Sequence, residues 1–237
     1  MPAIRLEGVA VDVPVADGGS RRLLDVPFLE LTEDRVSVVG ANGSGKSTLL
    51  RLLNGLVRPT HGRVLVDGRD TVGQGAAVRR QVAFAFTDPL SQLVMPTGRE
   101  DVELSLRRSH RDRRARRAAA QAVLDRFGLG AIADHSVYDL SGGERQLMAL
   151  AAVLAAEPDI LVLDEPSTLL DLRNTLLLRA TLASLPQRVV LATHDLDLAL
   201  EAERTLVIDA GRVVFDGSPA RAVAHYRSRC APPSARP

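Results

Sequence analysis

Short apolar runs separated by stretches of helical spacing organise the first quarter of this chain. Apolar or alternating segments at residues 4–13 and 23–31, with Gly, Pro and Asp between them, predict an opening group of strands. Residues 35–39, Arg-Val-Ser-Val-Val, predict a short buried strand. Residues 47–56 place apolar side chains at helical spacing, with a glycine near the end. We therefore expect strand, glycine-rich loop and helix in direct succession.

Strands and helices alternate along the rest of the chain. The expected strands are 63–67, 79–86, 159–163 and 188–192 with a closing pair near 205–215, and the expected helices are 101–127, 144–156 and 170–185. This alternation predicts an α/β fold with a mostly parallel sheet and its chemistry at the carboxyl ends of the strands. Ala, Arg and Leu at helical period in the middle of the chain indicate an inserted helical region. Residues 227–237 are expected to form a disordered tail.

Composition limits the classes of function. The chain has 237 residues, of which 46% are hydrophobic, so it can bury a core for one large domain, with or without an inserted subdomain. A formal net charge of +1 gives no global attraction to nucleic acid or to an anionic membrane. The single cysteine, Cys230, excludes an internal disulfide framework and fits a cytosolic protein. The longest apolar runs, such as 147–156, are about half of the roughly 20 residues that a membrane-spanning helix needs, so we expect no transmembrane segment.

A glycine-rich segment follows the strand expected at 35–39. Its residues are Gly40, Ala41, Asn42, Gly43, Ser44, Gly45, Lys46, Ser47 and Thr48, a complete G-x-x-x-x-G-K-[ST] pattern. Its three glycines would let successive N–H groups point inward at a polyphosphate, and the start of the helix adds the positive end of its dipole. A chance glycine-rich turn is the alternative, but it does not account for the whole pattern between a strand and a helix. The sequence therefore predicts a P-loop.

Five side chains are expected to supply the chemistry. Lys46 is the one lysine in the sequence and would reach the β- and γ-phosphates as a compact charge. The Ser47 hydroxyl would ligate Mg²⁺, and Thr48 would bond to the α-phosphate. Two acids end an apolar run: Asp164 would hold the Mg²⁺ shell, and Glu165 would orient and deprotonate a water. Alone, these acids could be an ordinary strand end, but beside a P-loop they predict ATP hydrolysis.

The segment Leu140-Ser-Gly-Gly-Glu144, at the start of a helix, is a second anion cradle. With this segment as its signature, the chain resembles the ATP-binding cassette family over residues 4–219. The resemblance implies that two cassettes pair head to tail, so that the signature of one contacts the γ-phosphate held by the other. The signature residues assigned to nucleotide binding are Ser141, Gly142, Gly143 and Glu144.

The resemblance also implies an architecture and two further site residues. It implies a P-loop NTPase domain over residues 1–226, with an antiparallel β subdomain, a RecA-like core and an α-helical subdomain inserted at about 88–157. Ser167-Thr-Leu-Leu-Asp171 matches the D-loop, in which Asp171 links the two sites of the dimer. Ala192-Thr-His-Asp195 matches the switch region, in which His194 senses the γ-phosphate while Glu165 acts as base. A lone histidine after a strand is more often structural, but its order and spacing here favour the catalytic assignment.

Two positions depart from the family pattern. Val13 stands where the family usually has an aromatic residue that stacks on adenine, so we expect a weak apolar contact and loose discrimination between ATP and GTP. Thr87 stands in place of the Q-loop glutamine; its hydroxyl can bond to Mg²⁺ or a water, but with shorter reach. Gln92 is the alternative candidate, although it is expected to belong to the following helix. Slow hydrolysis, or hydrolysis that depends on a membrane partner, is one interpretation; simple replacement by Thr87 is the other.

Two segments indicate a subgroup. Residues 88–97 followed by Glu100-Asp101, and residues 52–56, resemble the ATPases of energy-coupling factor importers, which drive uptake of vitamins and transition-metal ions. Residues 32–35 most resemble the biotin type. The resemblance implies ATP and Mg²⁺ as cofactors. It also implies a second cassette, a transmembrane scaffold and a substrate-binding membrane subunit as partners, and a peripheral place on the cytoplasmic side of the membrane. A soluble cassette ATPase and a weakly hydrolysing regulatory cassette are the alternatives.

The most basic part of the chain is residues 107–117. We interpret it as a solvated helix face, with contact to anionic headgroups or to an acidic loop of a partner as the alternative. No aromatic residues are interleaved with these arginines, so we expect no nucleic-acid partner.

Overall fold

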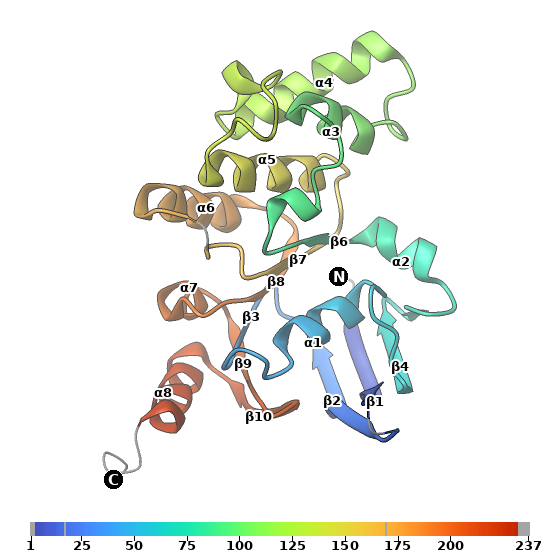
Figure 1. Ribbon diagram of the computed structural model, residues 1–237, viewed down its shortest axis with the longest axis vertical. Coiled ribbons are helices and arrows are strands. Elements are labelled where there is room, and N and C mark those ends of the chain that lie inside the picture. Colours follow the sequence, from blue (N-terminus) through green and yellow to red (C-terminus); the bar gives the residue numbers. More distant parts are fainter. Residues whose placement is uncertain (1–2, 17, 169, 232–237) are drawn as a thin grey trace.

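The computed structural model describes residues 3–16, 18–168 and 170–231, and its strands form two sheets (Figure 1). The first is antiparallel and has the order β2-β1-β4-β5. Its strands are β1 (Ile4–Pro14), β2 (Ser20–Leu31), β4 (His61–Val66) and β5 (Arg69–Asp70). One face packs on the core and the other faces water, so Ile4 and Leu6 are buried whereas Arg5 between them is exposed.

The second sheet has six strands in the order β10-β9-β3-β8-β7-β6. Its strands are β3 (Arg35–Val39), β6 (Val82–Ala85), β7 (Ile160–Asp164), β8 (Arg188–Ala192), β9 (Arg204–Asp209) and β10 (Arg212–Gly217). All are parallel except β10, which closes the sheet as a hairpin with β9. Every residue of β7 and β8 is buried, because both faces of a parallel sheet are covered. The carboxyl ends of β3, β6, β7 and β8 therefore meet at one edge.

Helices cover both faces of the second sheet. They are α1 (Lys46–Leu53), α2 (Gly75–Gln81), α6 (Leu172–Ser184), α7 (Leu196–Leu200) and α8 (Pro219–Cys230). Four fully buried leucines of α1 belong to a hydrophobic cluster that includes residues of both sheets, so α1 lies between them. α6 and α7 pack on the opposite face of the second sheet. No helix in the described ranges is long and apolar enough to cross a membrane.

A group of helices gathers at one end of the molecule, in green and yellow in Figure 1. Its elements are η1 (Pro89–Ser91), α3 (Gly98–Ser105), α4 (Arg113–Arg126), η2 (Gly130–Ile132) and α5 (Gly142–Leu154). They share their own hydrophobic cluster, which includes Val102, Leu124 and Met148. A capping box between Thr97 and Glu100 fixes the start of α3. This group is thus a packing unit distinct from the cluster around α1.

Two expected elements in the middle of the chain have different bounds. The strand expected at 79–86 begins only at Val82, because α2 continues through Gln81. The helical stretch expected at 101–127 is two helices. Asp112 begins the second by accepting a hydrogen bond from the N–H of Ala115, so the basic residues 107–117 span a turn and the start of α4 rather than one helix face.

The end of the chain also differs from the prediction. α8 continues to Cys230, so the expectation of a disordered tail is wrong for residues 227–230. Residues 232–237 lie outside the described residues.

Candidate functional site

The glycine-rich loop connects β3 to α1 and borders a cavity of about 350 Å³. The residues that line this cavity are Arg21, Leu23, Asn42, Gly43, Gly45, Lys46, Ser47, Thr48 and Glu165. Two glycines are required by close packing. A Cβ on Gly40 would lie 2.2 Å from the carbonyl oxygen of Ile208, and a Cβ on Gly45 would lie 3.1 Å from that of Leu23. The loop is thus clamped between β2 and β9.

The ammonium of Lys46 lies at the mouth of the loop. Its Nζ donates hydrogen bonds to the carbonyl oxygens of Gly40, at 2.8 Å, and Ala41, at 3.2 Å. It also lies 3.5 Å from Oε1 of Glu165. The side chain is only 6% exposed, so this cation is positioned by the loop rather than by solvent. A compact cation over inward-facing backbone amides is what a polyphosphate needs.

Two oxygens at the carboxyl end of β7 fit a magnesium ion. Ser47 Oγ donates to Asp164 Oδ1 at 2.9 Å, which brings a hydroxyl and a carboxylate together. Mg²⁺ bound with a nucleotide takes one or two protein oxygens, and phosphates and waters complete its shell. No group of three or more acidic, His or Cys side chains within 3–16, 18–168 and 170–231 could hold a metal ion by itself. The donor set therefore fits a metal that arrives with a phosphate ligand.

Asp164 is held by three neighbours. Burial raises the pKa of its carboxyl, which is only 2% exposed; the Ser47 hydrogen bond and the Arg51 cation oppose this rise. Nη2 of Arg51 lies 3.7 Å from Oδ2 of Asp164. Thr87 Oγ1 donates to the main-chain oxygen of Asp164 at 2.8 Å. The structure thus brings Thr87 to this edge, with its hydroxyl bonded to the strand end.

Glu165 lies between a cation and a histidine. Its φ of +52° is unusual for a residue with a side chain, and its N–H donates to the carbonyl of Ala192 at 3.0 Å. Oε2 accepts from the main-chain N–H of His194 at 3.0 Å and lies 2.7 Å from Nδ1 of His194. Oε1 is buried and has no hydrogen-bond partner within the described part of the chain. This carboxylate lines the cavity with Oε2 fixed by His194 and Oε1 beside the Lys46 ammonium.

The signature residues begin α5 away from the loop cavity. Ser141 caps the helix by accepting from the N–H of Glu144, and Oε2 of Glu144 accepts from the N–H and hydroxyl of Ser141, at 2.8 and 2.7 Å. These hydrogen bonds lower the pKa of Glu144. A Cβ on Gly143 would lie 2.3 Å from Nδ2 of Asn174, so α5 and α6 touch there. Ser141 and Gly142 are exposed, and none of the signature residues lines the cavity.

Asp171 and Val13 also lie outside the cavity lining. Asp171 is exposed and caps α6, because its carboxylate accepts from the N–H of Asn174 at 2.8 Å. Val13 pairs with Arg21 across the β1–β2 ladder, and it is Arg21 that lines the cavity. The contact of Val13 with a base stays a prediction, and its neighbour on β2 is the residue that borders the cavity.

The side-chain amide of Gln92 is engaged with two main-chain groups rather than with the Ser47–Asp164 pair. Gln92 directly follows η1; its Oε1 accepts from the N–H of Phe86 at 3.2 Å, and its Nε2 donates to the carbonyl of Ala149 at 2.8 Å. It therefore joins the end of β6 to α5. Sequence reasoning did not find this bridge.

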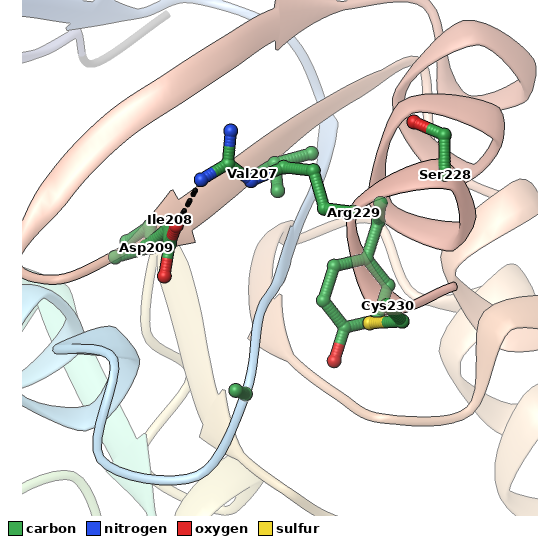
Figure 2. A pocket seen from close by; sticks show the side chains of 8 residues that line it. Val207, Ile208, Asp209, Ser228, Arg229 and Cys230 are labelled. Carbon is green, nitrogen blue, oxygen red and sulfur yellow. Dashed lines mark hydrogen bonds and ion pairs between the residues drawn. The ribbon is translucent and has the colours of Figure 1, made fainter. Parts of the chain in front are cut away.

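A larger cavity, of about 590 Å³, lies behind the loop between β9 and α8 (Figure 2). Figure 2 shows Arg229 extending toward Asp209, with which it forms an ion pair. Ala41 is the one residue of the glycine-rich loop in the lining, and neither acid from the end of β7 is part of it. Cys230 is exposed at the end of α8 and lines this cavity. The chemistry assembled by the loop lies in the smaller cavity.

Comparison with known proteins identifies the loop, the acids and the signature as parts of one family pattern. Residues 29–168 match a model of the ABC transporter family. The chain belongs to this family. The biotin transport ATP-binding protein BioM of Rhizobium etli is 44% identical over 209 residues, which cover 88% of this chain and 93% of that protein. The energy-coupling factor transporter ATP-binding protein EcfA1 of Halalkalibacterium halodurans is 37% identical over 190 residues, 78% of this chain and 68% of that protein.

A solved structure supports the fold. The ATP-binding cassette MJ0796, determined as a dimer in a post-hydrolysis state with ADP and Pi, superposes with a TM-score of 0.81 at 29% identity, over 91% of this chain and 98% of that one. The expected α/β cassette fold is confirmed. This ABC transporter chain is an ATPase whose hydrolysis is coupled to transport.

Proposed function

We propose that this chain is the ATP-hydrolysing subunit of an energy-coupling factor importer for a vitamin, with biotin as the first candidate. The ATPase assignment rests on family membership. The names of the BioM and EcfA1 relatives support the importer type and the candidate substrate. The single observation that carries the proposal is the set of contacts at the ends of β7 and β8, where Glu165 lies between Lys46 and His194 next to the Ser47–Asp164 pair.

The loop is proposed to hold the triphosphate. Backbone amides from Gly40 to Thr48 surround the phosphates, Lys46 contacts the β- and γ-phosphates, and the hydroxyl of Thr48 bonds to the α-phosphate. Ser47 and Asp164 would hold Mg²⁺, which offsets charge on the phosphates when bound; Thr87 holds the strand end that carries Asp164.

Glu165 is proposed to act as general base. One carboxylate oxygen is fixed by His194, so the other can accept a proton from a water placed in line with the γ-phosphate. His194 would then contact the γ-phosphate through the remaining ring nitrogen. The water oxygen attacks phosphorus, the bond to the ADP oxygen breaks, and the water proton goes to Glu165.

The site is proposed to be completed by a second cassette. The exposed N-terminus of α5 would place Ser141, Gly142, Gly143 and Glu144 against a triphosphate held by the partner, and Asp171 would link the two sites. The MJ0796 dimer supports this arrangement. The unit of α3 to α5, at about 88–157, is proposed as the inserted helical subdomain. A transmembrane scaffold and a substrate-binding subunit would hold the pair on the cytoplasmic side of the membrane.

Glu165→Gln tests the base and the dimer together. We expect hydrolysis to fall by about 10²–10⁴-fold, with ATP retained and a dimer that elutes earlier on size exclusion in ATP than in ADP. The control is Glu157→Gln, an exposed carboxylate with no side-chain partner in the described residues. Hydrolysis at the wild-type rate would refute the base; a monomer in ATP would refute the dimer. Uptake of labelled biotin is then compared between the wild type and Glu165→Gln, each assembled with its membrane subunits. Equal uptake in the two would exclude biotin as the substrate.

One observation favours a second candidate, a weakly hydrolysing regulatory cassette. The Thr87 hydroxyl is bonded to the main-chain oxygen of Asp164 rather than directed at the oxygens of the metal-binding pair. Wild-type protein assembled with its membrane subunits distinguishes the two functions. Hydrolysis that Glu165→Gln abolishes supports the motor, whereas ATP binding without turnover supports the regulatory cassette.

A further inference from the structure

Strand β2 forms the wall of the loop cavity that lies beyond the phosphate-binding residues. Leu23 and Arg21 both line this cavity, on either side of the register shift between Arg22 and Leu24 of β2. The carbonyl oxygen of Leu23 lies 3.1 Å from the position that a Cβ on Gly45 would take. Arg21 lies about 7 Å further along the strand. The side chain of Arg21 therefore begins further from the glycine-rich loop than that of Leu23. If the phosphates of a nucleotide lie in the loop, its base would extend in this direction.

Arg21 and its neighbour Arg22 differ in their contacts. Arg22 forms ion pairs with Asp12, at 2.9 Å, and Asp25, at 4.0 Å. Arg21 is exposed and has no hydrogen-bond or ion-pair partner among the residues that the structure describes. The alternation of β2 places these two arginines on opposite faces. The guanidinium of Arg21 is consequently free to meet a ligand, whereas that of Arg22 is engaged.

No aromatic side chain lines the cavity in the described part of the chain. Arg21 is the one lining residue that carries a guanidinium, a planar cation. A guanidinium stacks on aromatic faces and is more weakly hydrated than an ammonium. Val13 lies opposite Arg21 in the ladder, so an apolar side chain flanks the stem of the arginine.

We propose that Arg21 stacks its guanidinium on the base of the nucleotide whose phosphates lie in the loop. This inference rests on the proposed function and adds a specificity-determining residue to it. A guanidinium can stack on any planar base, so Arg21 favours nucleoside triphosphates over bare polyphosphate and discriminates little between adenine and guanine.

The experiment compares three ligands in the presence of Mg²⁺: ATP, GTP and inorganic tripolyphosphate. Equilibrium binding is measured on the full chain for Arg21→Ala, Arg21→Lys and Arg21→Tyr, with Arg22→Ala as the matched control. We expect Arg21→Ala to weaken ATP and GTP by about threefold to tenfold and to leave tripolyphosphate within about twofold. Arg21→Lys should behave like Arg21→Ala, because an ammonium is not planar, and Arg21→Tyr should restore nucleotide binding. Arg22→Ala should match the wild type.

Two results would overturn the stacking role. Equal weakening of tripolyphosphate and ATP by Arg21→Ala, with recovery in Arg21→Lys, would show that Arg21 contacts phosphate as a charge. Unchanged nucleotide affinity in every Arg21 variant would show that the guanidinium contacts nothing. Failure of the proposed function is separate, because it would appear in wild-type protein as absent tripolyphosphate binding or as hydrolysis that Glu165→Gln does not reduce.

Discussion

Neutralising the carboxylate at the end of β7 is expected to stabilise the ligand-free protein while removing its response to Mg²⁺. The perturbation is Asp164→Asn, which keeps the shape of the side chain and an oxygen that can accept from Ser47. Burial raises the pKa of Asp164, so the folded state binds the proton more tightly than the unfolded state does. The ionised form is therefore unfavourable in the folded protein, and a neutral side chain of the same shape removes the cost of burying the charge.

The size of the stability gain depends on how far the contacts of the Asp164 carboxylate offset the cost of burying its charge. Asp164 is 2% exposed, and the charge-assisted hydrogen bond from Ser47, worth about 1.5–3 kcal/mol, does not fully offset its desolvation. Arg51 adds little, about 0.5 kcal/mol, because its side chain is 45% exposed. We expect a net gain of about 1 kcal/mol in the free energy of unfolding, at the low end of the gains seen when buried charges are replaced. For a chain of this length, that raises Tm by about 2–4 °C.

The stability gain from Asp164→Asn should depend on pH, because the pKa of Asp164 differs between the folded and unfolded states. With a folded-state pKa above the ordinary value of about 3.9, wild-type stability falls as pH rises between these two values. The Tm gap between Asp164→Asn and wild type should therefore be near zero at pH 4, grow as pH rises, and become constant above the raised pKa. Other carboxyl groups titrate in both proteins and cancel in the gap.

Thermal unfolding from pH 4 to pH 8 is the assay, with Asp159→Asn as control. Asp159 precedes β7, is exposed, and has no side-chain partner in the described ranges, so its variant should unfold like wild type within about 0.5 kcal/mol. At 100-fold excess over Kd, Mg-ATP should stabilise wild type by about 2.7 kcal/mol. Asp164→Asn should gain no more from ATP with Mg²⁺ than from ATP with chelator. A variant less stable than wild type at pH 7.5, or a gap that does not shrink toward pH 4, would refute this account of Asp164.

Two further substitutions test the contacts that surround the site. Gln92→Leu leaves the N–H of Phe86 and the carbonyl of Ala149 without their partner, so we expect the free energy of unfolding in denaturant to fall by about 1–3 kcal/mol. An unchanged midpoint would mean that these two hydrogen bonds do not stabilise the fold. Gly40→Ala places a methyl group within 2.2 Å of the main-chain oxygen of Ile208, which cannot rotate away. We therefore expect about 1–3 kcal/mol of destabilisation and loss of ATP binding. Wild-type affinity in a titration with a fluorescent ATP analogue would contradict the close packing of the loop.

The candidate site residues whose placement follows from the sequence are those at the ends of strands. The pattern from Gly40 to Thr48 follows β3 directly, Asp164 and Glu165 end β7, and His194 follows β8, so a parallel sheet brings all of them to one edge. Their mutual placement needs only the strand order. It does not depend on side-chain packing elsewhere.

The residues that sequence reasoning missed depend on register and helix phase. Arg51 lies one turn after Ser47 on α1, so i,i+4 spacing could have placed it beside Asp164. Arg21 replaced Val13 as the cavity residue because the β1–β2 register is fixed by a hairpin with an irregularity between Val11 and Asp12, which no alternation pattern reveals.

The charges at this site explain why we expect a metal ion to bind together with the nucleotide. Asp164 and Glu165 are adjacent carboxylates at the edge where the triphosphate is proposed to lie. The two cations that contact them are already engaged: Lys46 with loop carbonyls and Glu165, and Arg51 with Asp164. A bare triphosphate would add negative charge beside two acids in a partly buried site, where repulsion is poorly screened. A divalent cation between Asp164 and the phosphates turns that repulsion into attraction. We therefore expect the carboxylate that weakens the ligand-free fold to be the one that makes nucleotide binding depend on Mg²⁺, and Asp164→Asn separates these two effects.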